Sequence, residues 1–171
     1  MANVFLIGFM GSGKSTIATC LAKNYGMDMI DMDQLIVERE GMSISDIFEQ
    51  KGELYFRDAE TNLLIQMQEE QNKVVSCGGG VVLREENVQA MKESGQVVLL
   101  DAKPETILER VADDDNRPLL HGNKNVQFIR DMMKKRQPNY ERAADFIIHT
   151  DGKSADMICK EIIEKINKTG E

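Results

Sequence analysis

The sequence of 171 residues contains no tryptophan, only three prolines and three cysteines, and no long apolar run. Cys20, Cys77 and Cys159 are odd in number and far apart, which argues against a disulfide framework and against a C-x-x-C zinc site. No stretch approaches the roughly 20 apolar residues of a membrane-spanning helix, and the N-terminus has neither the basic segment nor the cleavage site of a signal peptide. We therefore expect a protein of a reducing compartment, the cytoplasm, that does not enter a membrane.

Positive charge is also scarce, because 21 lysines and arginines stand against 29 acidic residues and the formal net charge is -8. A surface of that sign repels nucleic acid and anionic membranes, so we expect neither as a partner. An anionic ligand must then be held by a local basic pocket. The length suits one domain over residues 1–171, and we expect it to work as a monomer.

Short β-type runs alternate with helical patterns along the chain. The expected strands are Val4–Ile7, Met29–Met32, Val74–Cys77, Val97–Asp101 and Phe146–Thr150. The expected helices are Lys14–Asn24, Asp33–Glu40, a short helix that starts at Ser43, then Glu53–Glu70, Glu85–Glu93, Pro104–Val111, Val126–Ala144 and Ser154–Lys168. This alternation predicts a parallel sheet covered by helices on both faces, a three-layer α/β/α sandwich. The polar stretch from Asp113 to Asn125 has no periodicity and is long enough to be a functional loop.

The stretch GFMGSGKST, which follows the first strand and opens the first helix, matches the phosphate-binding pattern G-x-x-x-x-G-K-S. Backbone N–H groups of such a loop converge on phosphates, the lysine reaches the β- and γ-phosphates, and the serine hydroxyl ligates Mg²⁺. We expect a nucleoside triphosphate here, bound by Gly11, Ser12, Gly13, Lys14, Ser15 and Thr16. A GTPase would need Asn/Thr-Lys-x-Asp after a late strand, and FIIHTDGKSAD does not contain it.

Acidic residues stand at the end of the second strand, not the third, which runs into Gly78-Gly79-Gly80. Because side chains alternate along a strand, Asp31 and Asp33 are predicted to lie on one face. In an open parallel sheet the C-terminal strand ends line the ligand crevice, so these carboxylates are candidates for the chemistry. The alternative is that Asp33 caps the following helix.

GFMGSGKST, the Asp31-Met32-Asp33 pair, GELYFR, the triple glycine, RPLL and the later R-x-P-x-Y together resemble the shikimate kinases, over essentially the whole chain. The resemblance implies the P-loop NTPase fold with a five-stranded parallel sheet in the order 2-3-1-4-5. It also implies a substrate-binding segment at about residues 33–61 and a lid at about 112–125. The implied reaction is ATP- and Mg²⁺-dependent phosphorylation of the 3-hydroxyl of shikimate, in chorismate and aromatic amino-acid biosynthesis.

On the nucleotide side, the resemblance implies catalytic roles for Lys14 and for Arg117, which would close on the phosphates from the lid. Arg110 is similar to the arginine that stacks on adenine. Ser15 and Asp31 are the implied Mg²⁺ ligands.

On the acceptor side, Asp33 is similar to the residue that hydrogen-bonds the reacting hydroxyl, and it either accepts the proton or only orients the group. Arg57 and Arg136 resemble the two arginines that bind the substrate carboxylate, and Glu60 resembles the acid that orients Arg57. The remaining implied contacts are the backbone of Gly78, Gly79 and Gly80 and an apolar wall of Phe48 and Phe56.

Other interpretations stay open. Arg110 could be a solvated helix charge, and Phe48 and Phe56 could simply be core. Another small-molecule P-loop kinase, acting on gluconate or a nucleoside monophosphate, would share much of the pattern. A nucleotide-dependent switch without an acceptor site is the candidate from a different class.

Overall fold

The computed structural model of the chain describes residues 1–111 and 125–169. The expected lid at 112–125, with its Arg117, therefore lies outside the described residues apart from Asn125. Within the described ranges, no helix has the length and apolar character needed to cross a membrane.

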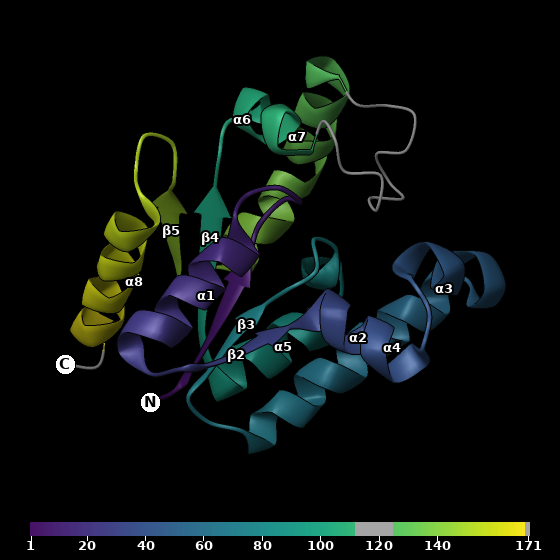
Figure 1. Ribbon diagram of the computed structural model, residues 1–171, viewed down its shortest axis with the longest axis horizontal. Coiled ribbons are helices and arrows are strands. Elements are labelled where there is room, and N and C mark those ends of the chain that lie inside the picture. Colours follow the sequence, from purple (N-terminus) through teal and green to yellow (C-terminus); the bar gives the residue numbers. More distant parts are fainter. Residues whose placement is uncertain (112–124, 170–171) are drawn as a thin grey trace.

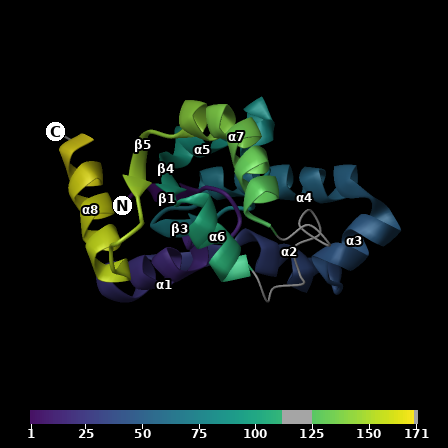
Figure 2. The ribbon, with the colours of Figure 1, turned by 90° about the horizontal axis from the view of Figure 1, so that it is seen from above.

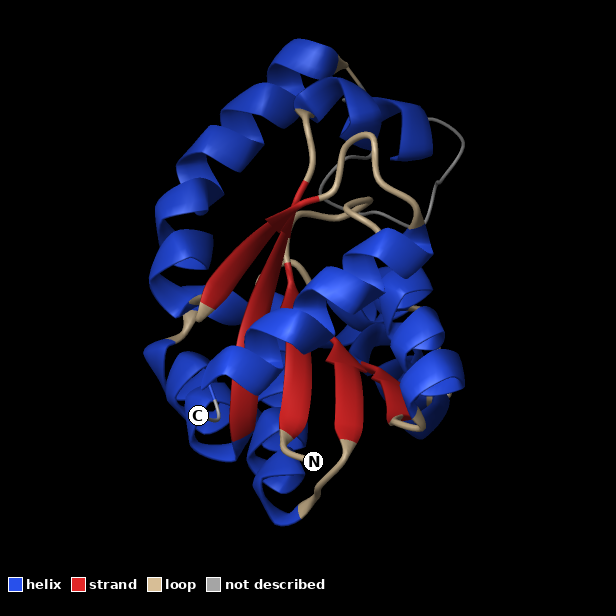
Figure 3. Ribbon diagram, turned by 90° about the vertical axis from the view of Figure 1, so that its left-hand side faces the viewer, coloured by secondary structure: helices blue, strands red, loops and turns tan. Residues whose placement is uncertain are grey.

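Five parallel strands form the central sheet (Figures 1 and 3). They are β1 (Asn3–Ile7), β2 (Asp28–Asp31), β3 (Lys73–Ser76), β4 (Gly95–Asp101) and β5 (Phe146–His149). Their order is β2-β3-β1-β4-β5, which confirms the expected topology. The register sets Leu6 of β1 beside Ser76 of β3 on one side and Val98 of β4 on the other. The end of β1, where the glycine loop begins, is thus central in the sheet.

Helices cover both faces of the sheet (Figure 2). They are α1 (Lys14–Tyr25), α2 (Met32–Glu40), α3 (Ile44–Lys51), α4 (Glu53–Gln66), α5 (Glu85–Ser94), α6 (Pro104–Val111), α7 (Val126–Ala143) and α8 (Ala155–Thr169), with short 3-10 turns η1 (Met67–Glu69) and η2 (Val81–Leu83). One hydrophobic cluster joins α1 and α8 to one face, and a larger cluster joins the other face to α2, α4, α5, α6 and α7. The three-layer architecture is confirmed.

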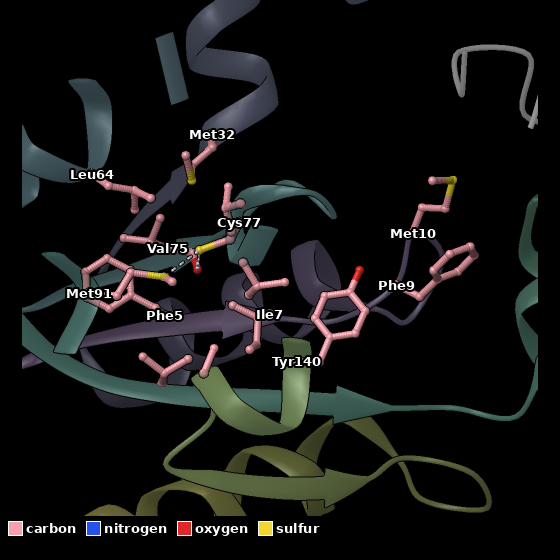
Figure 4. Close-up of a cluster of buried hydrophobic side chains, with 14 of the residues drawn as sticks. Phe5, Ile7, Phe9, Met10, Met32, Leu64, Val75, Cys77, Met91 and Tyr140 are labelled. Atoms are coloured by element: carbon pink, nitrogen blue, oxygen red, sulfur yellow. Dashed lines mark hydrogen bonds between the residues drawn. The ribbon is translucent and has the colours of Figure 1, made fainter. Parts of the chain in front are cut away.

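Alternation along β1 explains why the apolar run VFLI is continuous. Val4 and Leu6 belong to the cluster with α1 and α8, whereas Phe5 and Ile7 belong to the larger one, and all four are buried. Figure 4 shows Phe5 and Ile7 in the larger cluster, which includes Met91 and other apolar side chains. A strand buried on both faces needs apolar side chains at every position.

The expectation that Asp31 and Asp33 alternate on one strand is wrong. Strand β2 ends at Asp31, and Asp33 already lies in the first turn of α2. The Asp31 side chain accepts a hydrogen bond from the backbone N–H of Gln34 at 3.1 Å, so the helix starts directly at the strand end and the cap is Asp31, not Asp33. The expected helix over Glu53–Glu70 also ends early, at Gln66.

The fully buried side chain of Asn3 fixes the connection between α4 and β3. Its Nδ2 donates to the carbonyls of Met67 at 3.1 Å and Glu70 at 3.0 Å, and its Oδ1 accepts from the N–H of Lys73 at 2.9 Å. A side chain on β1 therefore gives partners to the Glu70 carbonyl and the Lys73 N–H and a second donor to the Met67 carbonyl, which also accepts from the Glu70 N–H at 3.1 Å.

We predict that Asn3→Ala lowers the free energy of unfolding by on the order of 3 kcal/mol, since each buried backbone group left without a partner costs about 1–3 kcal/mol. Urea unfolding followed by circular dichroism measures the change. Gln89→Ala, on the exposed face of α5, is the control and should stay within about 0.5 kcal/mol of the parent. Equal losses in the two variants would contradict the role of Asn3.

Candidate active site

The loop between β1 and α1 has the backbone that its glycines allow. Gly11 and Gly13 adopt φ values of 79° and 97°, a region open mainly to glycine. Lys14 begins α1, and its Nζ donates to the carbonyls of Gly8 at 2.7 Å and Phe9 at 3.0 Å. The loop thus curls around the lysine ammonium, which lies where a phosphate-binding loop needs positive charge.

Three oxygen-bearing side chains meet where α1 starts and where β2 and β3 end. The Ser15 hydroxyl donates to Asp31 Oδ2 at 2.8 Å and lies 3.3 Å from the Ser76 hydroxyl. Hydroxyl and carboxylate oxygens are hard donors that suit Mg²⁺, which usually keeps several water and phosphate ligands. Among the described residues there is no group of three or more His, Cys, Asp or Glu side chains that could hold a metal. The set therefore suits a Mg²⁺ bound chiefly to nucleotide phosphates, with Ser15 and Asp31 as protein ligands.

Gly78 lies between two carboxylates. A Cβ at this position would collide with Glu60 Oε2 and would stand 3.2 Å from Asp33 Oδ1. The first glycine of the triplet thus lets backbone approach Asp33 directly. Asp33, the aspartate predicted to bind the reacting hydroxyl, therefore lies beside the end of β3. It is placed there by the first turn of α2 and not by alternation along strand β2.

Gly79 faces Arg136 of α7. A Cβ there would stand 3.4 Å from Arg136 Nη1, and the Tyr140 hydroxyl donates to the Gly79 carbonyl at 2.6 Å. Arg136 Nη1 is buried and has no hydrogen-bond partner in the described part of the chain. The guanidinium also lies 6.0 Å from the ring centre of Phe9. A buried cationic donor without a partner is costly, and a bound carboxylate would satisfy it.

Gly80 faces Arg57 of α4, whose guanidinium occupies the space that a Cβ would need. Arg57 Nη1 donates to Glu60 Oε1 at 2.8 Å, and Nη2 donates to Glu53 at 3.3 Å. The three successive glycines therefore contact Asp33 and Glu60, then Arg136, then Arg57.

Glu60 is fully buried, and its Oε2 has no hydrogen-bond partner among the described residues. Burial raises the pKa of Glu60 to about 7; the adjacent guanidinium of Arg57 opposes the rise, and the charge of Asp33 adds to it. The expected contact between Glu60 and Arg57 is present. Glu60 and Glu53 each accept one bond from the guanidinium, and a guanidinium has five N–H donors, so donors remain for a further acceptor.

Phe48 and Phe56 lie beside each other, with ring centres 5.2 Å apart and planes tilted by 57°. Phe56 is buried in the larger cluster, and Phe48 is partly buried against it. The two rings connect α3 to α4, next to Arg57.

A cavity of about 780 Å³ runs along the C-terminal edge of the sheet. Its lining residues are Gly11, Ser12, Gly13, Lys14, Ser15, Thr16, Ile17, Asp31, Asp33, Gln34, Ile44, Ser76, Cys77, Gly78, Gly79, Arg110, Thr150, Lys153, Ala155 and Ile158. The structure therefore brings the glycine loop, both aspartates, two of the three glycines and Arg110 to one cavity. Gly80, Arg57, Arg136, Phe48 and Phe56 do not line it. Arg136 and Arg57 adjoin it through Gly79 and Gly80, and the ring of Phe56 lies 5.4 Å from the Arg57 guanidinium.

The far end of this cavity contains residues that the sequence reasoning missed. Thr150, Lys153, Ala155 and Ile158 come from the loop after β5 and the start of α8. Their only signal in the sequence was their position after a strand of a parallel sheet.

Two contacts brace this end of the cavity. Arg110 Nη1 donates to the Gly11 carbonyl at 3.0 Å, which places the arginine against the glycine loop. Asp151 accepts from the Lys103 N–H at 2.8 Å and from the Thr106 hydroxyl at 2.6 Å, and so ties the loop after β5 to the start of α6.

Fold and site together define a P-loop phosphotransferase with a carboxylate and two arginines beside the phosphate site. The family model described as "Shikimate kinase" matches residues 10–167. A shikimate kinase of Persephonella marina is 46% identical over 166 residues, covering 97% of this chain and 99% of that protein. A shikimate kinase of Sulfurihydrogenibium sp. is 42% identical over 168 residues, covering 98% of this chain and 99% of that protein.

Among solved structures, the shikimate kinase from Acinetobacter baumannii in complex with shikimate superposes with a TM-score of 0.93 at 34% identity, covering 99% of this chain and 94% of that one. The chain belongs to the shikimate kinase family.

The raised pKa of Glu60 predicts a specific pH dependence of stability. Because the folded protein holds this proton more tightly than the unfolded chain, the group stabilises the fold most below its ordinary pKa of 4.5, and the contribution declines as the pH rises to about 7. The unfolding free energy of the parent minus that of Glu60→Gln should fall by on the order of 3 kcal/mol across this range.

Urea unfolding at several pH values between 5 and 8 measures this difference. The matched control is Glu53→Gln, which removes the exposed acidic partner of the same Arg57. Its difference from the parent should change little with pH. Parallel profiles for the parent and Glu60→Gln would contradict the assignment.

Proposed function

We propose that this chain transfers the γ-phosphoryl group of ATP to the 3-hydroxyl of shikimate. The observation that carries the proposal is the row of contacts along Gly78–Gly80, which brings Asp33, Arg136 and Arg57 to one backbone segment beside the phosphate loop. A substrate with one carboxylate and several hydroxyls suits this set, because arginine pairs with carboxylates in a bidentate way and an aspartate accepts from a hydroxyl.

The proposed roles of the described residues on the nucleotide side follow from their positions. Lys14 would shift from the carbonyls of its own loop to the β- and γ-phosphates. Ser15 and Asp31 would hold Mg²⁺, which neutralises phosphate charge when bound. Arg110 would contact the adenine end of ATP. Arg117, outside the described residues, keeps its proposed contact with the transferring phosphate on the resemblance alone.

On the acceptor side, Asp33 would accept a hydrogen bond from the reacting hydroxyl and hold it in line with the phosphoryl group. A loose transition state demands little proton removal, so orientation is the larger contribution. Arg57 and Arg136 would bind the carboxylate. Gly78–Gly80 would admit the ring hydroxyls close to backbone, and Phe48 and Phe56 would form the apolar side.

The proposal also covers the setting: a monomer working in the cytoplasm on small molecules, without nucleic acid or membrane. The net charge of -8 and the free thiols support it. The buried Glu60 beside Arg57 argues against the alternative of a nucleotide-dependent switch without an acceptor site. Such a charge pair costs desolvation and suits a site that needs an oriented guanidinium.

Coupled measurement of ADP release tests the proposal directly. With ATP and Mg²⁺, we expect turnover with shikimate and much less with quinate, gluconate or AMP. Lys14→Ala should lower kcat at least about 100-fold while leaving the fold intact, since its charge acts on phosphates. Faster turnover with gluconate or AMP would instead support another P-loop kinase, and no acceptor-dependent release would support the switch.

Arg57→Lys tests the carboxylate site, because lysine keeps the charge but loses the planar pair of donors. The KM for shikimate should rise on the order of 10- to 100-fold, equivalent to about 1.5–3 kcal/mol of charge-assisted hydrogen bonding. The KM for ATP should change far less. Arg84→Lys, which alters a surface pair with Asp58, is the control. An equal rise for both substrates in Arg57→Lys would place this residue outside the acceptor site.

A further inference from the structure

Two cysteines that the proposed function does not use face each other across neighbouring helices. Cys20 lies on α1 and Cys159 on α8, and these helices pack side by side on one face of the sheet (Figures 1 and 2). Cys20 Sγ lies 3.4 Å from Asp156 Oδ1, one turn before Cys159 on α8. Reciprocally, Cys159 Sγ lies 3.7 Å from the carbonyl of Ile17, one turn before Cys20 on α1. Each thiol therefore contacts the helix that carries the other.

The two thiols differ in access. Both cysteines are free thiols. Cys159 is buried, whereas Cys20 is partly exposed. Cys20 lines a groove of about 720 Å³ along α1 and α8, together with Lys23 and Lys160. A small molecule can thus reach the first sulfur but not the second. The groove also contains the Asp156 carboxylate, so its two lysines give it a local excess of positive charge of only one.

We propose that Cys20 and Cys159 form a redox-active pair that low-molecular-weight disulfides oxidise to an intramolecular disulfide between α1 and α8. Cys20 attacks one sulfur of the oxidant, whose S–S bond breaks, and the thiol proton passes to the departing thiolate. Cys159 then attacks the Cys20 sulfur of the mixed disulfide, and its proton passes to the second departing thiolate. Two protein thiols are oxidised, and one external disulfide is reduced to two thiols.

The surroundings of the pair set the order of these steps. Cys20 is the more accessible thiol, and its Sγ accepts from Asn24 Nδ2 at 3.3 Å and donates to Asp156 Oδ1 at 3.4 Å. Burial raises the pKa of the Cys159 thiol, and the neighbouring Cys20 raises it further. The second attack is therefore the slower one, and a mixed disulfide on Cys20 precedes the internal bond.

The internal bond would connect two walls of the cavity described above. Helix α1 begins at Lys14, which lines the cavity. Helix α8 begins at Ala155, and its first turn lines the cavity with Ala155 and Ile158. It would also close a loop of well over 100 residues, so an unstrained bond raises the melting temperature by restricting the unfolded chain.

The test uses the full chain under native conditions with glutathione disulfide as the oxidant, quenched in acid and analysed by intact mass and peptide mapping. The parent should first gain one glutathione on Cys20, and then lose it to leave a protein two hydrogens lighter, with Cys20 linked to Cys159. This oxidised form should melt at a higher temperature than the reduced form.

Three variants sharpen the result. In Cys159→Ala the glutathione adduct on Cys20 should persist, and Cys20→Ser should gain no adduct. Cys77→Ser, which removes the third thiol, should behave as the parent. The proposal is overturned if the adduct on Cys20 persists in the folded parent, if the link forms only in denaturant, or if the linked form melts at a lower temperature. Because none of these readouts requires turnover, they are independent of the proposed kinase activity.

Discussion

The site depends on three consecutive positions without a side chain at the end of β3. At each of them a Cβ would meet a different functional group, and at two of them it would overlap atoms that are themselves buried or charged. Gly78–Gly80 thus act as the surface on which Asp33, Arg136 and Arg57 converge from α2, α7 and α4. An alanine at Gly78 or Gly80 would displace side chains of α4, Glu60 and Arg57, whereas a Cβ at Gly79 would just reach Arg136 of α7.

Convergence on this backbone has an electrostatic cost that the rest of the fold must offset. Glu60 is buried with one oxygen unpartnered, and Arg136 has a buried N–H without an acceptor among the described residues. Both costs are tolerated because the larger hydrophobic cluster packs directly behind them, with Phe56, Tyr140 and Phe9 each contributing to it. A bound anion would satisfy the arginine, so part of the cost of the unliganded site becomes affinity for a carboxylate.

Much of this could be predicted from the sequence because local rules and tertiary structure agree. The glycine loop, the strand ends and most helix starts are set by neighbouring residues. The failures have tertiary causes. Helix α4 ends at Gln66 and gives way to the turn Met67–Glu69, and the carbonyls of Met67 and Glu70 accept from Asn3, more than 60 residues away in the sequence. Asp31 ends its strand by capping a helix. Neither Lys153 in the cavity wall nor the Cys20–Cys159 pair has a local signal in the sequence.

The sheet itself explains why the reacting groups meet where they do. One face, through α1 and α8, supports the phosphate loop and the far end of the cavity. The other face, through α2, α4 and α7, supports the carboxylate and the arginines of the acceptor side. Strand β1 is the central strand of the described sheet, with β3 and β2 on one side and β4 and β5 on the other. Its alternating side chains belong to both hydrophobic clusters. The groups supported from the two faces therefore meet at the end of that strand, where the Lys14 ammonium donates to the Gly8 carbonyl and where Asp33, Gly78 and Gly79 line the same cavity.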